Sequence, residues 1–147
     1  MENKNEELRK LTAEIRYLEQ TAEAIQARNN VVSSVLTDLT YANMTLEGME
    51  KEKEESELLI PIGGASYIKA KLGCIDKVIV GIGAGVSTEK TLPEAKEIVK
   101  KRLEDLEKTR TSLQRQFSQV AQKMNEDRDR FESLVAEMRE GKSQQNV

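Results

Sequence analysis

Histidine and tryptophan are absent from this chain of 147 residues, and cysteine, proline and aromatic residues are scarce. Without histidine, imidazole acid–base catalysis and imidazole metal ligation are excluded. The single cysteine, Cys74, cannot form a disulfide within the chain, which is typical of a reducing compartment. Only 37% of the residues are hydrophobic and 33% are charged, so little material is available for a compact core. We therefore expect an elongated or oligomeric molecule.

An excess of charge of one sign is also lacking. The chain has 23 basic and 26 acidic residues, and the two signs are interspersed, so no basic stripe could neutralise nucleic-acid phosphates. The amino terminus, MENKNEELRK, lacks the apolar core of a signal peptide, and the longest apolar run, residues 78–86, is too short to span a bilayer. We expect a soluble, cytoplasmic protein that binds neither nucleic acid nor membrane.

A seam of apolar residues runs along the first third of the chain with the alternating steps of three and four that a coiled-coil helix requires. Ten of its thirteen positions are apolar and no proline interrupts it. Asn29 and Asn43 lie on the seam, where a buried amide costs stability but penalises slipped registers. This first seam consists of Leu8, Leu11, Ile15, Leu18, Ala22, Ile25, Asn29, Val32, Leu36, Leu39, Asn43, Leu46 and Glu50. We expect a helix over residues 1–55.

The last third carries a second seam, in which ten of twelve positions are apolar. Its helix has a marked start, because Thr91 suits the N-cap and Glu94 the carboxylate of a capping box. The second seam consists of Val99, Leu103, Leu106, Arg110, Leu113, Phe117, Val120, Met124, Asp127, Phe131, Leu134 and Met138. We expect a helix over residues 92–140, ended by Gly141, and a disordered tail over 141–147.

Between the seams the period changes to two, which is typical of strands. Residues 56–91 read as two β-hairpins, the first turning at Gly63 and Gly64. Alternating apolar residues would share one face of each hairpin: Leu58, Ile60, Ile62, Ile68, Ala70 and Leu72 in the first, and Val78, Val80, Ile82 and Val86 in the second. Pro61 cannot donate a ladder hydrogen bond and belongs at an edge or a bulge. Short hairpins are marginal alone, so their open edges need partners.

The short connection makes the two long helices antiparallel neighbours. The sequence therefore predicts an α+β fold, a single domain over residues 1–147 in which a coiled-coil helical hairpin carries two β-hairpins at its base. The acidic stretch 47–57 and the cations Lys96, Lys100, Lys101 and Arg102 each have the wrong sign for their own helix dipole. Antiparallel packing would set them side by side. The other interpretation is that both are solvated charge runs.

The glycines Gly81, Gly83 and Gly85 read G-x-G-x-G, whereas a dinucleotide fingerprint needs G-x-G-x-x-G before a helix. The segment that follows, VSTEKT, is strand-like, and no G-K-[ST] follows at P-loop spacing. The glycines are better explained as positive-φ positions in a tight turn than as a nucleotide site. We expect no cofactor.

Acidic residues are abundant, but they lie on periodic helix faces with nothing to hold a pair in a desolvated pocket. We therefore expect no enzyme activity. The one acidic group that suggests a metal consists of Glu126, Asp127, Asp129 and Glu132, and Arg128 and Arg130 alternate with it. A solvated helix surface is the favoured interpretation. Cys74 has only Lys77 as a nearby base, which favours a structural thiol over a nucleophile.

With helix, hairpin, hairpin and helix in this order, the chain resembles the prefoldin family, specifically an α-class subunit of the archaeal type. The resemblance is carried by LLIPIGGASYIKAKL at 58–72 and VIVGIGAGVSTEK at 78–90, between the two coiled-coil halves, and it spans essentially the full length. The pair of hairpins is its most specific feature, because β-class subunits carry one. The turn at 63–66 reads Gly-Gly-Ala-Ser, where the family pattern is Gly-Ala-Gly-Ser.

The resemblance implies a hexamer of two α-class and four β-class prefoldin subunits. The hairpins of all subunits would pair into a β-barrel platform, and the apolar residues of the two hairpins given above would form that oligomer interface. The coiled coils would hold unfolded protein clients at their far ends without ATP and pass them to a group II chaperonin. No nucleotide motif is needed for that role.

The residues that we expect to contact clients are the apolar positions at the free ends of the helices. Adaptable, non-directional contacts suit leucine, phenylalanine and methionine. This set consists of Leu8, Leu11, Ile15, Phe131, Leu134, Val135 and Met138. The alternative is that these residues only zip the helices together. For the whole chain, the alternative function is a structural coiled-coil assembly or tethering protein that binds no client, and nucleotide binding or catalysis is a distant third.

Overall fold

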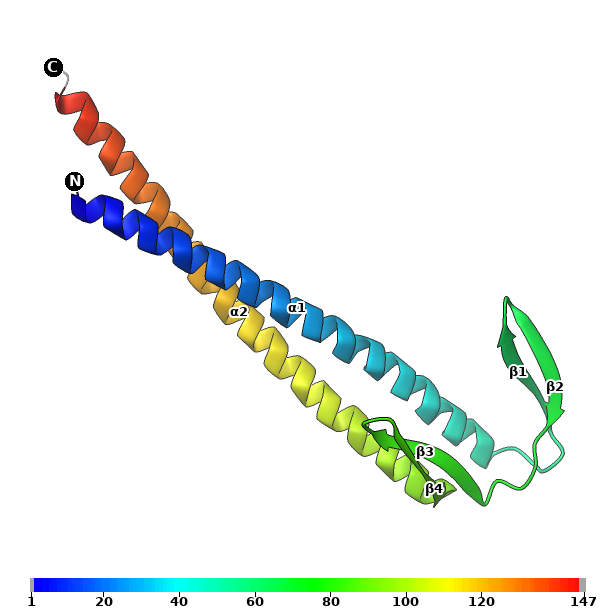
Figure 1. Ribbon diagram of the computed structural model, residues 1–147. Helices are drawn as coiled ribbons and strands as arrows, with labels where there is room; N and C mark the ends of the chain where they lie inside the picture. The colour runs from blue at the N-terminus through cyan, green and yellow to red at the C-terminus, as the bar shows by residue number, and fades with distance from the viewer. Residues whose placement is uncertain (1, 146–147) are drawn as a thin grey trace. The chain divides into compact units, whose positions relative to one another are not determined.

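The computed structural model, described for residues 2–145, has two long helices with two β-hairpins between them in sequence (Figure 1). The elements are α1 (Glu2–Glu50), β1 (Glu57–Gly63), β2 (Ser66–Lys71), β3 (Lys77–Gly83), β4 (Val86–Thr91) and α2 (Leu92–Gln145). This order confirms the predicted α+β fold. The chain divides into two compact units. Unit 1 contains the residues up to Ser33 and from Lys108 onward, and unit 2 is Ser34–Glu107.

In unit 1 the two helices run antiparallel. Lys4 pairs with Glu137, and further along α1 Glu14 pairs with Lys123, so ascending numbers on one helix meet descending numbers on the other. The predicted seams are the covered faces. Every first-seam position from 8 to 32 is buried or half-buried, and on the second seam from 110 to 138 only Phe117 is exposed. The 3.5-residue period therefore identified the packed faces correctly.

Unit 2 has a small core in which helix and sheet meet. Leu39 of α1, Val80 of β3, and Ala95 and Val99 of α2 are buried against one another. Arg102 fixes the strand in place, because its Nη1 donates a hydrogen bond of 2.8 Å to the carbonyl oxygen of Gly81. The hairpin β3–β4 thus covers the base of both helices.

The predicted capping box is present at the start of α2. The backbone N–H of Glu94 donates to Thr91 Oγ1, and the backbone N–H of Thr91 donates to Glu94 Oε2, both at 3.3 Å. Two helix-end donors are thereby satisfied reciprocally. The predicted charge contact is confirmed at one pair, Lys96 with Glu50 at 2.7 Å. Arg102, another cation of the predicted cluster, instead donates its hydrogen bond to the Gly81 carbonyl.

Both hairpins have the same construction. Leu58 pairs with Ala70 and Ile60 with Ile68, which confirms the predicted register of the first hairpin. An extra residue then shifts the register between Pro61 and Gly63, so the proline flanks a bulge as expected. The same shift occurs between Gly81 and Gly83 in the second hairpin.

Two-residue turns close the hairpins, and both central residues of each turn have positive φ. The values are 55° and 56° at Gly64 and Ala65, and 52° and 72° at Ala84 and Gly85. This is the type I′ pattern that matches the strand twist. The departure from the family order at 63–66 therefore moves alanine to the second central position without a change of turn type.

Two predicted boundaries were wrong. The helix α1 ends at Glu50 rather than at 55, and the next amides close shorter bonds, Lys51 N–H to the Gly48 carbonyl and Glu52 N–H to the Met49 carbonyl. The clustered acids there oppose the negative helix end. The helix α2 passes through Gly141 to Gln145. One glycine costs only about 1 kcal/mol, and Lys142 suits the last turn. Residues 146–147 of the expected tail lie outside the described residues.

The strained alanine predicts a stabilising substitution. An L-residue at positive φ costs on the order of 1 kcal/mol, so Ala65→Gly should stabilise the hairpin β1–β2 by about 0.5–1 kcal/mol. Gly64→Ala, at the other centre of the same turn, is the matched control and should destabilise it by a similar amount. Hydrogen exchange of the β1 and β2 amides measures the opening free energy. Equal protection in both variants would contradict the strain.

Candidate functional site

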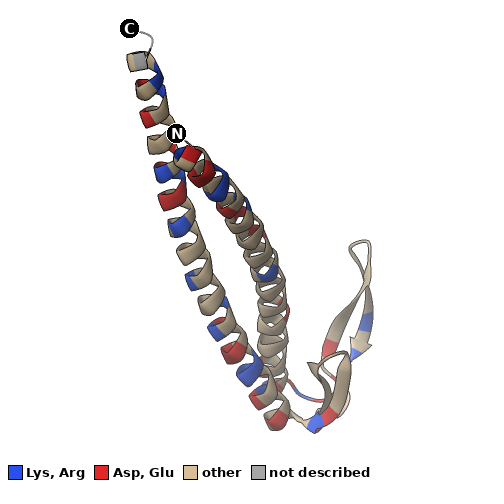
Figure 2. Cartoon of the chain, turned by 60° about the vertical axis from the view of Figure 1, so that its left-hand side comes forward, with Lys and Arg blue, Asp and Glu red and all other residues tan. Residues whose placement is uncertain are grey.

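The ends of the two helices in unit 1 carry many charged side chains on their surface. We define the tip as residues 2–19 of α1 and 123–145 of α2, which carry interspersed charges of both signs (Figure 2). Ion pairs join the helices across the tip: Lys4 with Glu137 at 2.8 Å, Glu7 with Arg130 at 2.8 Å, Glu14 with Lys123 at 3.4 Å and Glu19 with Arg128 at 3.0 Å. These exposed pairs contribute little stability individually, but together they fix which turns of the helices face each other.

The pairs shift the titration of their members. A hydrogen bond from Lys4 lowers the pKa of the Glu137 carboxyl below its ordinary value. The Glu7 carboxylate raises the pKa of Arg130, mainly by accepting its hydrogen bond. Hydrogen bonding to Asp127 likewise raises the pKa of Lys123, with a smaller contribution from Glu14. All three shifts favour the charged form of the residue that is shifted.

All seven predicted client residues lie in the tip, but not equally exposed. Leu134 is fully buried and Leu11 is 9% exposed, so these two hold the helices together. The other five keep part of their apolar surface in solvent: Leu8, Ile15, Phe131, Val135 and Met138 are half-buried. Leu11 and Leu134 could meet a client only if the helices separated.

A groove of about 380 Å³ opens on this surface. Leu8 and Phe131 are predicted residues on its wall, and the remaining lining residues are Arg9, Thr12, Ala13 and Arg16 of α1. The seam did not indicate these four, because they lie off the 3.5-residue period. The spacing of the two arginines could have indicated a shared surface, because Arg9 and Arg16 are seven residues apart and therefore lie on the same helix face.

A buried carboxylate interrupts the second seam. Asp127 is 3% exposed, and its Oδ1 accepts a hydrogen bond of 2.5 Å from Lys123 Nζ, which also contacts Glu14. Within residues 2–145 its Oδ2 is buried without a partner. The interpretation of Glu126, Asp127, Asp129 and Glu132 as a solvated surface is therefore wrong for Asp127, whose seam position places it between the helices. No acidic or thiol cluster in the described chain could hold a metal.

A second gap in the packing surrounds Asn29, the polar seam residue. The groove here has a volume of about 470 Å³, and Ile25, Leu113 and Phe117 supply its apolar walls. Asn29 Oδ1 is buried and lacks a hydrogen-bond partner within the described residues. Phe117 is 39% exposed. The seam is thus open where the amide of Asn29 replaces an aliphatic side chain.

The hairpins present a different surface. On β1–β2, Ile60, Ile62 and Ile68 are each about half exposed, and Leu58 and Ala70 are half-buried. On β3–β4, Ile82 and Val86 are exposed and Val78 is half-buried. Val80 and Leu72 are both 7% exposed, so this chain already covers these two expected interface residues.

Three exposed apolar or aromatic residues lie on the strand faces opposite to the predicted interface residues. Ile79 is 79% exposed, Leu59 64% and Tyr67 58%. The predicted alternation was correct. On β3, however, the face predicted as the oligomer interface packs on this chain's own helices through Val80. An apolar residue on the second face was the available signal, because a strand that is apolar on both faces is covered on both sides.

The glycine-rich stretch is a turn. Gly83 and Gly85 have φ of 107° and 72°, and β4 follows them directly, so no helix N-terminus faces a phosphate there. Cys74 is exposed, and hydrogen bonding to Asp76 raises the pKa of its thiol, which disfavours the nucleophilic thiolate. Within residues 2–145 neither helix has a stretch long and apolar enough to cross a bilayer.

Comparison with known proteins agrees with this geometry. The family model "Prefoldin subunit" matches residues 1–137. A prefoldin subunit alpha of Methanococcoides burtonii is 33% identical over 84% of this chain and 89% of its own length. A prefoldin subunit alpha of Methanopyrus kandleri is 34% identical over 79% of this chain and 77% of its own.

A solved structure has the same fold. The filamentous prefoldin of Methanocaldococcus jannaschii, seen by cryo-electron microscopy, superposes with a TM-score of 0.65 over 78% of this chain and 94% of its own, at 21% identity. Two long helices with two small β-hairpins between them in sequence are the fold that this chain shares with that structure. The chain belongs to the prefoldin family, and the relatives named here are α-class subunits. This membership supports a chaperone-type role.

Asp127 predicts an asymmetry between single and double substitutions. Lys123→Met leaves a buried carboxylate without its donor and should lower the free energy of unfolding by about 1–3 kcal/mol. The double variant Lys123→Met with Asp127→Leu removes both charges and should be neutral or stabilising. Urea unfolding followed by circular dichroism measures both. A double variant as unstable as the single one would contradict this account.

The Lys4–Glu137 pair predicts a pH effect at the helix ends. Because the folded pKa of Glu137 is lowered, the stability it contributes is present above the unfolded pKa and is lost as pH falls through the folded value. Carbon-13 NMR titration should give Glu137 a pKa below that of an ordinary glutamate, and Lys4→Met should raise this pKa, because it removes the main cause of the shift. Lys10→Met, which affects only the local contact with Glu6, is the control and should leave Glu137 unchanged.

Proposed function

We propose that this chain is an ATP-independent holdase subunit, which captures unfolded polypeptides at the tip and delivers them to a group II chaperonin in the cytoplasm. The observation that carries the proposal is the half-exposed apolar set at the tip, Leu8, Ile15, Phe131, Val135 and Met138, inside a shell of ion pairs. Apolar surface in water attracts the apolar side chains of an unfolded chain. The charges around it keep the tip soluble.

The tip chemistry suits clients of varied sequence. Met138 and Phe131 offer polarizable or flat apolar surface with no buried hydrogen-bonding group that a client must satisfy. Leu11 and Leu134, which are buried, hold the two helices in place beneath this surface. Binding therefore needs neither nucleotide nor a fixed client shape.

For assembly, we propose that the hairpins join those of β-class prefoldin subunits, in a hexamer of two α-class and four β-class chains. The hairpin β1–β2 is a two-stranded sheet with Leu59, Ile60, Ile62, Tyr67 and Ile68 exposed. Such a sheet is marginal by itself, so added strands would complete its hydrogen bonding and cover its apolar faces. Ile79, Ile82 and Val86 extend the proposed interface to the second hairpin.

The second candidate is a structural assembly or tethering subunit that uses the same hairpins and binds no client. It is favoured by the burial of Leu11 and Leu134, which serve packing. The two functions differ in one measurement, which is whether the assembled protein binds a denatured test protein. Stable assembly without such binding would establish the second candidate.

A substitution pair tests the tip. Phe131→Ser with Met138→Ser should reduce suppression of aggregation of a chemically denatured test protein, without nucleotide, by at least about half, because it removes two of the five half-buried apolar side chains of the tip. Val31→Ser with Tyr41→Ser removes side chains that are 64% and 65% exposed elsewhere on α1 and is the matched control. The control should retain full suppression.

Deletion gives the stronger version of this test. Removal of residues 1–18 and 128–147 should abolish suppression while native mass spectrometry with a β-class partner still detects the assembly. Circular dichroism verifies that helices remain. Unchanged suppression after deletion would falsify the placement of the client site at the tip.

A further inference from the structure

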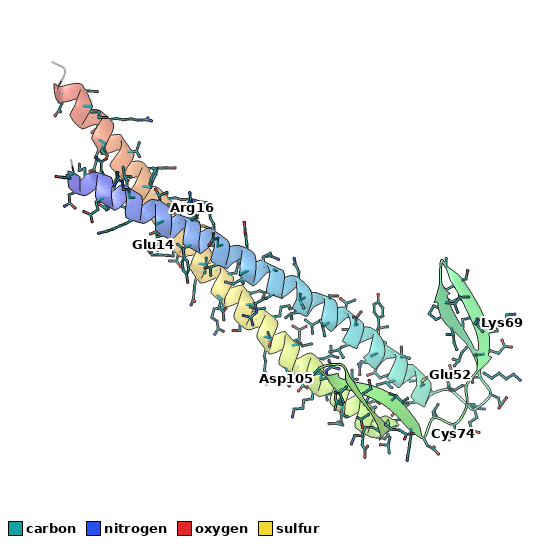
Figure 3. The ribbon with its side chains drawn as sticks, viewed as in Figure 1. Glu14, Arg16, Glu52, Lys69, Cys74 and Asp105 are labelled. Atoms are coloured by element: carbon teal, nitrogen blue, oxygen red, sulfur yellow. The ribbon has the colours of Figure 1, made fainter. Side chains whose placement is uncertain are left out.

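The tip groove combines apolar walls with two cations that form no ion pair within the described residues 2–145. Leu8, Ala13 and Phe131 line it, and Arg9 and Arg16 lie along it (Figure 3 labels Arg16). The hydroxyl of Thr12, also in the lining, already donates to the Leu8 carbonyl at 2.8 Å. The hydrogen-bond donors that the groove can offer to a ligand are therefore the two guanidinium groups.

Four carboxylates of α1 close in sequence to the two arginines form ion pairs with other cations. Glu6 pairs with Lys10, and three further acids of α1 pair with cations of α2: Glu7 with Arg130, Glu14 with Lys123 and Glu19 with Arg128. Arg9 and Arg16 form no ion pair within residues 2–145. Figure 3 shows Glu14 and Arg16 leaving α1 on different sides, as expected for residues about 200° apart on a helix. Arg9 and Arg16 therefore give the α1 side of the groove positive charge that no ion pair within residues 2–145 offsets.

The spacing of the two arginines sets the spacing of a ligand's charges. Seven residues of helix rise by about 10.5 Å. An unfolded polypeptide often adopts the polyproline II conformation, in which residues i and i+3 lie on the same edge about 9.3 Å apart. Two carboxylates at i and i+3 of such a chain would reach both guanidinium groups, and the apolar residues between them would meet Leu8, Ala13 and Phe131.

We propose that this groove selects client segments in which acidic residues three apart flank apolar ones, such as Asp-Leu-Leu-Asp. The inference rests on the proposed client-binding function and names the class of segment that the tip prefers. Carboxylates flanking an apolar pair are repelled by a purely acidic surface and gain nothing from a neutral one. Arg9 and Arg16 therefore turn a general apolar groove into a selective one.

The test uses the full-length chain, assembled with its β-class partner, and fluorescein-labelled 12-residue peptides. The probe contains Asp-Leu-Leu-Asp, one control peptide contains Lys-Leu-Leu-Lys, and another contains Leu-Asp-Asp-Leu with the same composition as the probe. Fluorescence anisotropy should show the probe binding about three- to tenfold more tightly than either control at low salt. The difference should shrink as ionic strength rises.

Substitutions assign the effect to the groove. Arg9→Gln with Arg16→Gln should bring the affinity for the probe down to that for the control peptides. Arg28→Gln, an exposed arginine of the same helix outside the groove, should leave it unchanged. Aggregation suppression is measured alongside. Equal binding of all three peptides by a protein that suppresses aggregation overturns the selectivity alone, whereas loss of both peptide binding and suppression overturns the proposed function and the inference with it.

Discussion

Burial of the two seams between the helices is the interaction on which the rest of the structure depends. The hairpins are only two-stranded, and the buried cluster of unit 2, where α1, β3 and α2 meet, itself includes the seam residues Leu39 and Val99. Leucines and valines at alternating steps of three and four supply the packing, and fully buried Val99 and Leu134 belong to the second seam. The hairpins carry further large aliphatic side chains, such as Ile60, Ile68 and Ile79, which this chain leaves exposed and which are therefore available for contacts with other molecules.

The same constraint explains why much of the fold could be predicted. Heptad spacing, the capping box at Thr91 and Glu94, and the alternation around Pro61 are local patterns, and each was recovered in the structure. The ends of the helices could not be predicted as well. Neither the extension of α2 through Gly141 nor the early end of α1 depends on a single residue, since end effects of about 1 kcal/mol compete there.

The residues of the candidate site could be predicted only in part, because their exposure depends on how the helices and hairpins pack. Apolar residues at the tip follow the seam, so their position was predictable, but the division into buried Leu134 and half-buried Phe131 depends on how the helices rotate against each other. Arg9 and Arg16 were missed because the sequence does not show which cation each neighbouring carboxylate pairs with, and a cation can be identified as unpaired only when those pairs are known. Likewise, the choice between Val80 and Ile79 as the outer face of β3 required knowledge of what the hairpin packs on.

The bond from Arg102 to the Gly81 carbonyl has a consequence for how strands can be added. An unpaired carbonyl at the edge of a two-stranded sheet can accept a hydrogen bond from another strand. Here the side chain of Arg102, from the chain's own helix α2, already donates to it. Docking of a foreign strand along this margin of β3 would have to displace a guanidinium group first. In the proposed assembly, Arg102 would therefore disfavour strand addition at this edge of β3 and leave the other edges of the hairpins as the places where a strand can pair.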